Sequence, residues 1–297
     1  MGRNNYIFWL DVINYQNYVL ILWMEGKEMN VEMPVMTPEQ IDAKVKRSIE
    51  YVKKLQIPAP QEKSRSTTFK SVTEKTPCAI LNDKQVICFT EKLSPVLKSD
   101  VLNSVLLAQL VATKAFPLDS KTKKYDVVSW YGKYREVLEG IGWVTQGFSF
   151  TKHHVQGDSF EADKVLLELL GGMLTGPHIA IATSAINAIK QLSSKDSNAS
   201  TIYRRNTQSD LQGNFGIGAC SESNGSARLE FGVFYLSIEK KTNDILWTKY
   251  SSNNNSISIG TASVVLMPEI YEGVRADILR MLSGNAASFI ADLDLGL

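Results

Sequence analysis

The pattern of apolar and polar positions changes character about two-thirds of the way along the chain. In the first part apolar residues recur at helical spacing in several segments, beginning with Ile41, Val45 and Ile49. From about residue 201 to about residue 262 short apolar runs alternate with turn signals such as Asn224-Gly225, which is typical of strands. The sequence therefore predicts an α+β fold, in which an antiparallel β-meander of about four or five strands packs against multiple helices in a complex mixed topology.

Capping residues indicate where several helices begin. Thr37 followed by Gln40 forms the pattern of a capping box, with Pro38 at the first helical position. Asp100 is expected to cap a strongly apolar helix. Asp158 and Glu161 form a further capping-box pattern, ahead of the most apolar part of the chain.

The most apolar stretch runs from Leu169 to Ile189 and contains no Asp, Glu, Lys or Arg. At roughly 20 residues it is near the length of a membrane-spanning helix. Gly176-Pro177 interrupts it, however, because proline disrupts a helix interior. We therefore expect two buried helices, over about 159–174 and 178–193, joined by a tight turn. The many small residues in this hairpin allow close approach by a helix, a membrane or a long apolar ligand.

The length of 297 residues allows one large domain. We expect a single α+β domain over residues 34–297 and an N-terminal extension over residues 1–33. Within the extension, residues 6–23 are apolar and aromatic but carry interspersed polar residues, and no cleavage site for a secretory signal is recognisable.

The charge distribution disfavours a nucleic-acid partner. The 32 basic and 31 acidic residues are spread along the chain and leave a net charge of +1, whereas nucleic-acid binders concentrate positive charge. The three histidines and three cysteines show no metal-ligand spacing, so no metal is expected.

The cysteines Cys78, Cys88 and Cys220 are odd in number and have no framework spacing. This pattern fits a chain with free thiols in a reducing compartment. Cys78 and Cys88 both lie in an expected β-hairpin over residues 78–90, where a disulfide between them is a conceivable alternative.

Cys220 admits three interpretations. It can be a buried structural thiol, which is the commonest role for cysteine in an apolar strand. It can be a nucleophile, as in an acyltransferase, if His153 or His154 lies beside it. This enzymatic alternative is weakened by the neighbours of Cys220, which supply no cationic or helix-terminal setting.

The third interpretation is a fatty acid held on Cys220 as a thioester. Gly216, Gly218 and Ala219 are small and would leave room beside the strand. A sixteen-carbon chain brings about 10 kcal/mol of burial at ~0.8 kcal/mol per CH₂, and must be covered by apolar protein or a bilayer. The helical hairpin around residues 169–189 is the candidate to cover this acyl chain. The residues expected to line it are Leu170, Gly172, Met173, Ile181 and Ala185.

Over roughly residues 78–292 the chain resembles the Erwinia virulence factor family of bacterial proteins. The resemblance rests on the order of elements and on the phrases VICFTEKLS, LNSVLLAQLVATKAFP, WYGKYREVLEGIGWVTQGFSF and SFEADKVLLELLGGMLTG. It implies a mixed α/β fold and no established enzymatic activity. It also implies a covalently bound palmitic acid on one cysteine, needed for action at membranes in an insect gut.

Together these observations predict an S-acylated virulence or persistence factor that acts at lipid membranes or vesicles, with an unknown host partner. The resemblance implies synthesis in the bacterial cytoplasm, followed by membrane association or delivery to a host. The resemblance does not say which cysteine is modified. Cys220 is the choice from its local sequence, with Cys78 and Cys88 as alternatives. A thiol enzyme that uses a Cys–His pair, and a protein-binding module without chemistry, are the other two hypotheses.

Overall fold

The computed structural model describes residues 36–59, 78–81, 85–90, 93–117, 119, 121, 126–153, 158–174, 177–194, 208–209, 212–238, 249–251, 255–283 and 289–291. The expected N-terminal extension and His154 lie outside the described residues.

The described helices are α1 (Pro38–Lys54), α2 (Pro95–Ala115), α3 (Val127–Gly140), α4 (Ala162–Met173), α5 (Pro177–Ser194) and α7 (Pro268–Leu282). The strands of the first half are β1 (Cys78–Leu81), β2 (Gln85–Phe89), β3 (Trp143–His153) and β4 (Ser159–Glu161). Those of the second half are β5 (Gln208–Ser209), β6 (Gln212–Ser223), β7 (Ser226–Ser237), β8 (Lys249–Ser251), β9 (Ser256–Leu266) and β10 (Phe289–Ala291).

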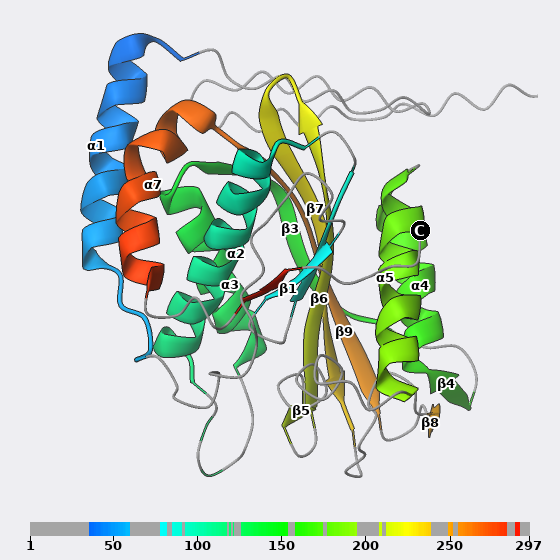
Figure 1. Cartoon of the computed structure of the whole chain (residues 1–297). Coiled ribbons are helices and arrows are strands. Elements are labelled where there is room, and N and C mark those ends of the chain that lie inside the picture. Colours follow the sequence, from blue (N-terminus) through cyan, green and yellow to red (C-terminus); the bar gives the residue numbers. More distant parts are fainter. Residues whose placement is uncertain are drawn as a thin grey trace, which may run out of the picture.

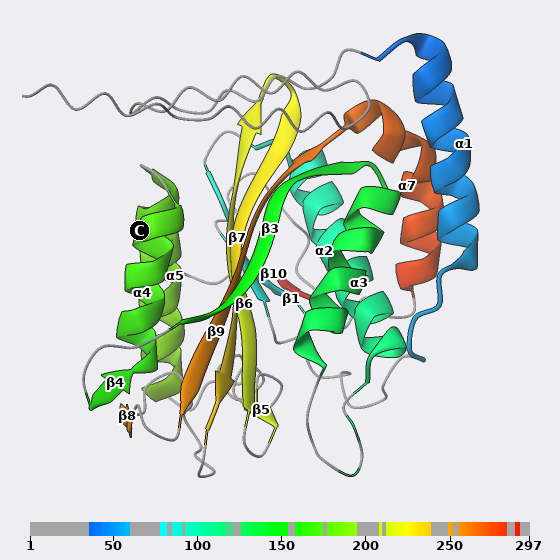
Figure 2. The ribbon, with the colours of Figure 1, turned by 180° about the vertical axis from the view of Figure 1, so that it is seen from behind.

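A single large sheet divides the molecule into layers. Its strand order is β10-β1-β2-β6-β7-β9-β3, and β5 pairs with β6 beside this path. Helices α1, α2, α3 and α7 lie on one side of the sheet, and α4 and α5 lie on the other (Figures 1 and 2). The predicted α+β class, with antiparallel strands packed against several helices, is confirmed. We call the first side the core face and the second the hairpin face.

The centre of the sheet contains β6, β7 and β9 of the predicted meander, which pair antiparallel, and β3 from the first part of the chain pairs with β9. Strand β8, which also lies in the predicted range, instead pairs with β4 in a separate two-stranded sheet. The β6–β7 turn is made by Asn224 and Gly225 with positive φ of 52° and 75°. Gly225 tolerates this left-handed conformation because it has no Cβ. The pairing of β2 with β6 is parallel, so residues from the two halves of the chain meet at the middle of the sheet.

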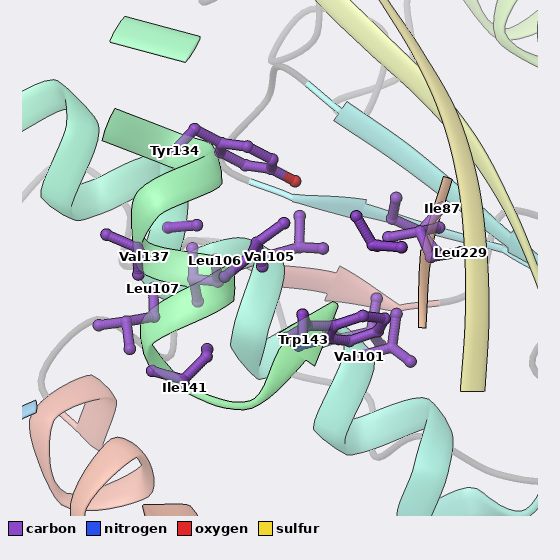
Figure 3. Close-up of a cluster of buried hydrophobic side chains, with 14 of the residues drawn as sticks. Ile87, Val101, Val105, Leu106, Leu107, Tyr134, Val137, Ile141, Trp143 and Leu229 are labelled. Atoms are coloured by element: carbon purple, nitrogen blue, oxygen red, sulfur yellow. The ribbon is translucent and has the colours of Figure 1, made fainter. Parts of the chain in front are cut away.

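The core face carries the largest cluster of buried apolar side chains (Figure 3). Tyr134 is fully buried there and meets the ring of Phe231 edge-on, with centroids 5.8 Å apart. Helix α2 is buried around most of its circumference, which is typical of a helix enclosed by its own protein. It is also the one helix among the described residues that is long and apolar enough to cross a membrane.

Buried polar side chains join the core-face helices to the sheet. Gln109 on α2 donates its Nε2 hydrogen to Oε1 of Gln85 on β2 over 2.9 Å, and the Tyr134 hydroxyl donates to the same oxygen over 3.2 Å. The Tyr131 hydroxyl on α3 donates to Oδ1 of Asn214 on β6 over 2.7 Å. These contacts fix α2 and α3 on the sheet, because a buried polar group without its partner is costly.

The helix starts confirm one capping prediction and correct another. The capping box of Thr37 and Gln40 is present at the start of α1. Asp100 does not begin a helix: α2 starts earlier, at Pro95, where the Ser94 side chain accepts from Leu97 N. Asp100 lies inside α2, where its carboxylate instead accepts two hydrogen bonds from Arg275 on α7.

The predicted helical hairpin is confirmed as α4 and α5, but its expected capping box is not. The N-cap of α4 is Glu161, whose side chain makes no capping hydrogen bond. Residues 159–161 form β4, which pairs antiparallel with β8. The helix therefore starts at Ala162, after the last paired residue.

Candidate functional site

Cys220 is the free cysteine of the described residues and is completely buried in β6. It lies on the core face, within the largest apolar cluster. Across the ladders it is opposite Leu229 on β7 and Phe89 on β2. Burial raises the pKa of the Cys220 thiol, so the side chain is a neutral thiol rather than a nucleophilic thiolate.

The glycines near Cys220 do not leave the expected room. A Cβ at Gly218 would lie 3.0 Å from the side chains of Ile87 and Leu229 and 3.1 Å from Phe231. At Gly216 it would lie 3.1 Å from the Gln85 side chain. The expectation of free space beside the strand is therefore corrected: neighbouring side chains already fill the space that these glycines leave.

The hairpin and Cys220 face opposite sides of the sheet. Side chains alternate along a strand, so Ala219 points to the hairpin face and its neighbour Cys220 to the core face. Ala219 indeed belongs to the cluster beneath α4 and α5, and Cys220 does not. An acyl chain on Cys220 would have to cross the sheet to reach the hairpin.

The five residues expected to line a lipid site occupy different environments. Leu170 and Ala185 are fully buried beneath the hairpin, and Ile181 packs against the same cluster. Gly172 is exposed on α4, and a Cβ there would meet nothing within 4 Å. The side chain of Met173 lies outside the described set. The two halves of the expected lipid site, the cysteine and the hairpin, do not meet.

Cys78 and Cys88 form a disulfide across the β1–β2 pair. They are directly opposite in the ladder register, and both are fully buried in the cluster on the hairpin face. The alternative of a disulfide between them therefore holds, in place of the expected free thiols. A disulfide is the state that persists in oxidising compartments.

The structure does not bring His153 to Cys220. Cys220 aligns through Leu229 with Val264 on β9, whereas His153 aligns with Ile257 on the same strand. Strands rise about 3.3 Å per residue, so this offset alone separates the two positions by about 23 Å along the sheet. Together with the neutral thiol, this separation argues against a Cys220–His153 catalytic pair.

A polar cluster that the sequence did not predict joins the hairpin to the sheet. Nδ1 of His178, in the first turn of α5, lies 3.1 Å from Oε2 of Glu230 on β7. Nε of Arg228 lies 3.3 Å from Oε1 of the same carboxylate. The His178 hydrogen bond, followed by the nearby Arg228 charge, holds the pKa of Glu230 below its usual value against the effect of burial.

The signal for this cluster was present in the sequence. Arg228 and Glu230 are two residues apart in a strand that is otherwise almost entirely apolar. Charges two residues apart in such a strand lie on the same face. Buried charged groups need hydrogen-bond partners, so this pair indicates a further polar contact on the same face. His178 makes that contact with Glu230.

Comparison with family models and with curated proteins finds no match for this chain. Among solved structures, the chain resembles the activated Cyt2Ba monomer from Bacillus thuringiensis subsp. israelensis, with a TM-score of 0.35 and 12% identity, covering 61% of this chain and 96% of that one. It resembles the Evf virulence factor with the same TM-score and identity, covering 76% of this chain and 88% of that one. A delta-endotoxin matches with a TM-score of 0.35 and 11% identity, over 71% of this chain and 90% of its own. These values describe a distant likeness of fold and carry no argument about function.

Proposed function

We propose that this chain is a bacterial virulence or persistence factor that acts at membranes and carries a fatty acid, palmitic acid by preference, as a thioester on Cys220. The observation that carries the choice of cysteine is the pairing of Cys78 with Cys88. A thioester needs a free thiol, and this pairing leaves Cys220 as the free thiol among the described residues. The proposed role at membranes is motivated by the resemblance of the sequence to the Erwinia virulence factor family.

The acyl chain belongs on the core face in this proposal. Cys220 is surrounded there by apolar side chains of the largest cluster, which is the environment that a hydrocarbon chain requires. Since the spaces at Gly216 and Gly218 are filled, accommodation of the chain requires neighbouring side chains to shift. Acylation of a fully buried thiol also requires that the core be open when the thiol sulfur attacks the carbonyl carbon of an activated acyl donor, such as an acyl thioester, whose own thiol leaves with the proton.

The hairpin has a separate role in this proposal, as the element that meets the bilayer. It forms a layer of its own on the opposite side of the sheet (Figure 1). Its described outer positions include the small residues Gly171, Gly172 and Ala180, which are exposed. At these three positions no bulky side chain keeps the α4–α5 pair away from another surface, so its backbone can approach that surface closely.

The first experiment is the intact mass of the purified protein before and after neutral hydroxylamine, which cleaves thioesters. We expect an excess of about one palmitoyl group that hydroxylamine removes, and no excess in Cys220→Ala. Peptide mapping of the wild type then locates the group. An unmodified wild-type mass, or an adduct that remains in Cys220→Ala, contradicts acylation at Cys220.

Membrane action is tested separately by flotation with phospholipid vesicles. We expect wild type to float with the vesicles and Cys220→Ala to float less. Equal flotation of both proteins contradicts a role for the acyl chain in membrane binding. Rapid alkylation of unmodified Cys220 by iodoacetamide near neutral pH would instead favour the thiol-enzyme alternative, which requires a reactive thiolate.

A further inference from the structure

The polar cluster of His178, Glu230 and Arg228 lies at the turn end of the hairpin. His178 is the second residue of α5, so it follows directly on the connection from α4. Both partners are largely buried: the side chains of His178 and Glu230 are 12% and 17% exposed. Because a carboxylate can only accept, Nδ1 of His178 carries the hydrogen that it donates to Oε2 of Glu230.

This end of the hairpin is only partly buried against the sheet. Ala182 and Ala185 are buried but small, and the larger Ile179 and Ile181 of α5 are only partly buried against the same cluster. Hydrophobic stabilisation grows with the apolar area removed from water, so the incomplete burial of these isoleucines limits what they contribute. The contact between His178 and Glu230 adds a polar contact to the sheet at this end of α5.

Few charged groups surround the contact between His178 and Glu230. The charges that act on Glu230 are those of His178 and Arg228. Strands β2 and β6 present apolar residues and the Cys88 disulfide to the hairpin. The ionisable residues described on α4 are Asp163, Lys164 and Glu168, of which Lys164 pairs with Glu161 on the preceding strand.

We propose that the contact between His178 and Glu230 is a pH-dependent lock on the α4–α5 hairpin. While Glu230 is ionised, the lock holds the turn end of the hairpin on the sheet. Protonation of Glu230 removes the charge that His178 and Arg228 contact, and this end of the hairpin then separates from β7. The lock is a property of the chain in solution, so it can be tested without a membrane and independently of the proposed function.

The direction of the pH dependence follows from linkage. The pKa of Glu230 is lowered in the folded state, first by the His178 hydrogen bond. Its contribution is therefore fully present above the ordinary value of 4.5 and is lost as the pH falls through the lowered value.

The test measures the separation between the two helical layers by spin labels on Ala180→Cys and Val128→Cys. Ala180 is exposed on α5, and Val128 is 64% exposed on α3, on the other side of the sheet. The variant Glu230→Gln keeps the size of the side chain but removes its charge. At pH 7 we expect Glu230→Gln to show about a tenfold larger population of long separations than wild type. Wild type should gain the same population only in acid, below pH 4.5.

Glu168→Gln is the matched control, because Glu168 is exposed on α4 of the same hairpin. It should follow wild type at every pH. Identical separations for Glu230→Gln and wild type at pH 7 overturn the lock. The near-UV circular dichroism of the aromatic core is recorded in parallel, so that separation of the hairpin is distinguished from unfolding. If wild type unfolds completely in acid, the comparison of Glu230→Gln with wild type at pH 7 still tests the proposal.

Discussion

The two faces of the sheet are held by different kinds of side chain. On the core face, α1, α2, α3 and α7 cover a cluster that includes Trp130, Tyr131, Tyr134 and Phe231. On the hairpin face, α4 and α5 cover smaller clusters, in which the aromatic residues come from strands and the two helices contribute aliphatic side chains such as Leu170, Ala185 and Ile186. The helices of the core face add aromatic side chains, which bury more area than aliphatic ones. The free energy of folding is therefore concentrated on the core face, and the hairpin is the layer that can separate at lower cost.

The polar contacts differ in the same way. On the core face the Asp100 side chain is 3% exposed and accepts two hydrogen bonds from Arg275, and the Tyr271 hydroxyl donates to the backbone oxygen of Asp100 over 3.1 Å. On the hairpin face the contact between His178 and Glu230 is partly exposed and involves a histidine. The first arrangement joins α7 to α2 by two hydrogen bonds to a buried carboxylate, whereas the second is the contact that we propose to open when Glu230 is protonated. If that proposal holds, the core face supplies stability and the hairpin face supplies conformational change.

The largest expected effect is the loss of an aromatic ring from either face of β7. Phe231 points to the core face and meets Tyr134, whereas Phe234 points to the hairpin face and stacks on Phe215 with centroids 5.3 Å apart. Phe231→Ala should lower the free energy of unfolding by about 4 kcal/mol. Phe234→Ala should cost only about 3 kcal/mol, because the hairpin layer can shift into the cavity. Urea unfolding measures both losses, and an equal or larger loss for Phe234→Ala would remove the distinction between the faces.

The next effect concerns the buried charge on α2. Arg275→Met should lower the free energy of unfolding at pH 7 by about 3 kcal/mol, because it leaves the carboxylate of Asp100 buried without a partner. Arg280→Met is the control: Arg280 is largely exposed and pairs with Asp277 on the surface, so its loss should cost less than about 1 kcal/mol.

The free energy of unfolding of Arg275→Met is also predicted to depend on pH. Burial raises the pKa of Asp100, and Arg275 opposes that rise. The stability from a raised pKa is fully present below the ordinary value of 3.8 and is lost as the pH rises through the folded value. Without Arg275 the pKa rises further, so Arg275→Met should lose more stability than wild type between pH 4 and pH 7. Urea unfolding at both pH values checks this, and a loss of the same size at pH 4 and pH 7 would mean that removal of Arg275 leaves the pKa of Asp100 in the folded state unchanged.

Much of the fold could be predicted from local patterns. The capping box at Thr37 and the turn at Asn224-Gly225 each need only a few neighbouring residues, and both are present. The expected hairpin over residues 78–90 brings Cys78 and Cys88 near each other, but a two-residue turn at Asn82-Asp83 would pair Cys78 with Ile87. The register that places Cys78 opposite Cys88 pairs Leu81 with Gln85, so the disulfide did not follow from that turn.

The rest depends on contacts between distant residues. Asp100 looks like a helix cap in the sequence, because nothing local reveals that Arg275 will bind its carboxylate. The alternation of a strand shows that Ala219 and Cys220 face opposite sides. It does not show which side the hairpin covers, because β7, the neighbour of β6, is apolar on both faces. The glycines beside Cys220 suggested space because the side chains that fill it come from β2 and β7.

The smallest expected effects come from a pair of glycines, one on each face. At Gly218 on the core face an added methyl would press against Ile87, Leu229 and Phe231, so Gly218→Ala should destabilise the protein by about 1–3 kcal/mol. At Gly172 on α4 the methyl would meet nothing within 4 Å, so Gly172→Ala should stabilise it by up to about 1 kcal/mol, the difference in helix propensity. Urea unfolding measures both. A neutral Gly218→Ala would mean that the core beside Cys220 yields easily, and a core that yields there can also admit an acyl chain. A large loss would mean that any chain on Cys220 has to be in place before α2 and α3 close over the sheet.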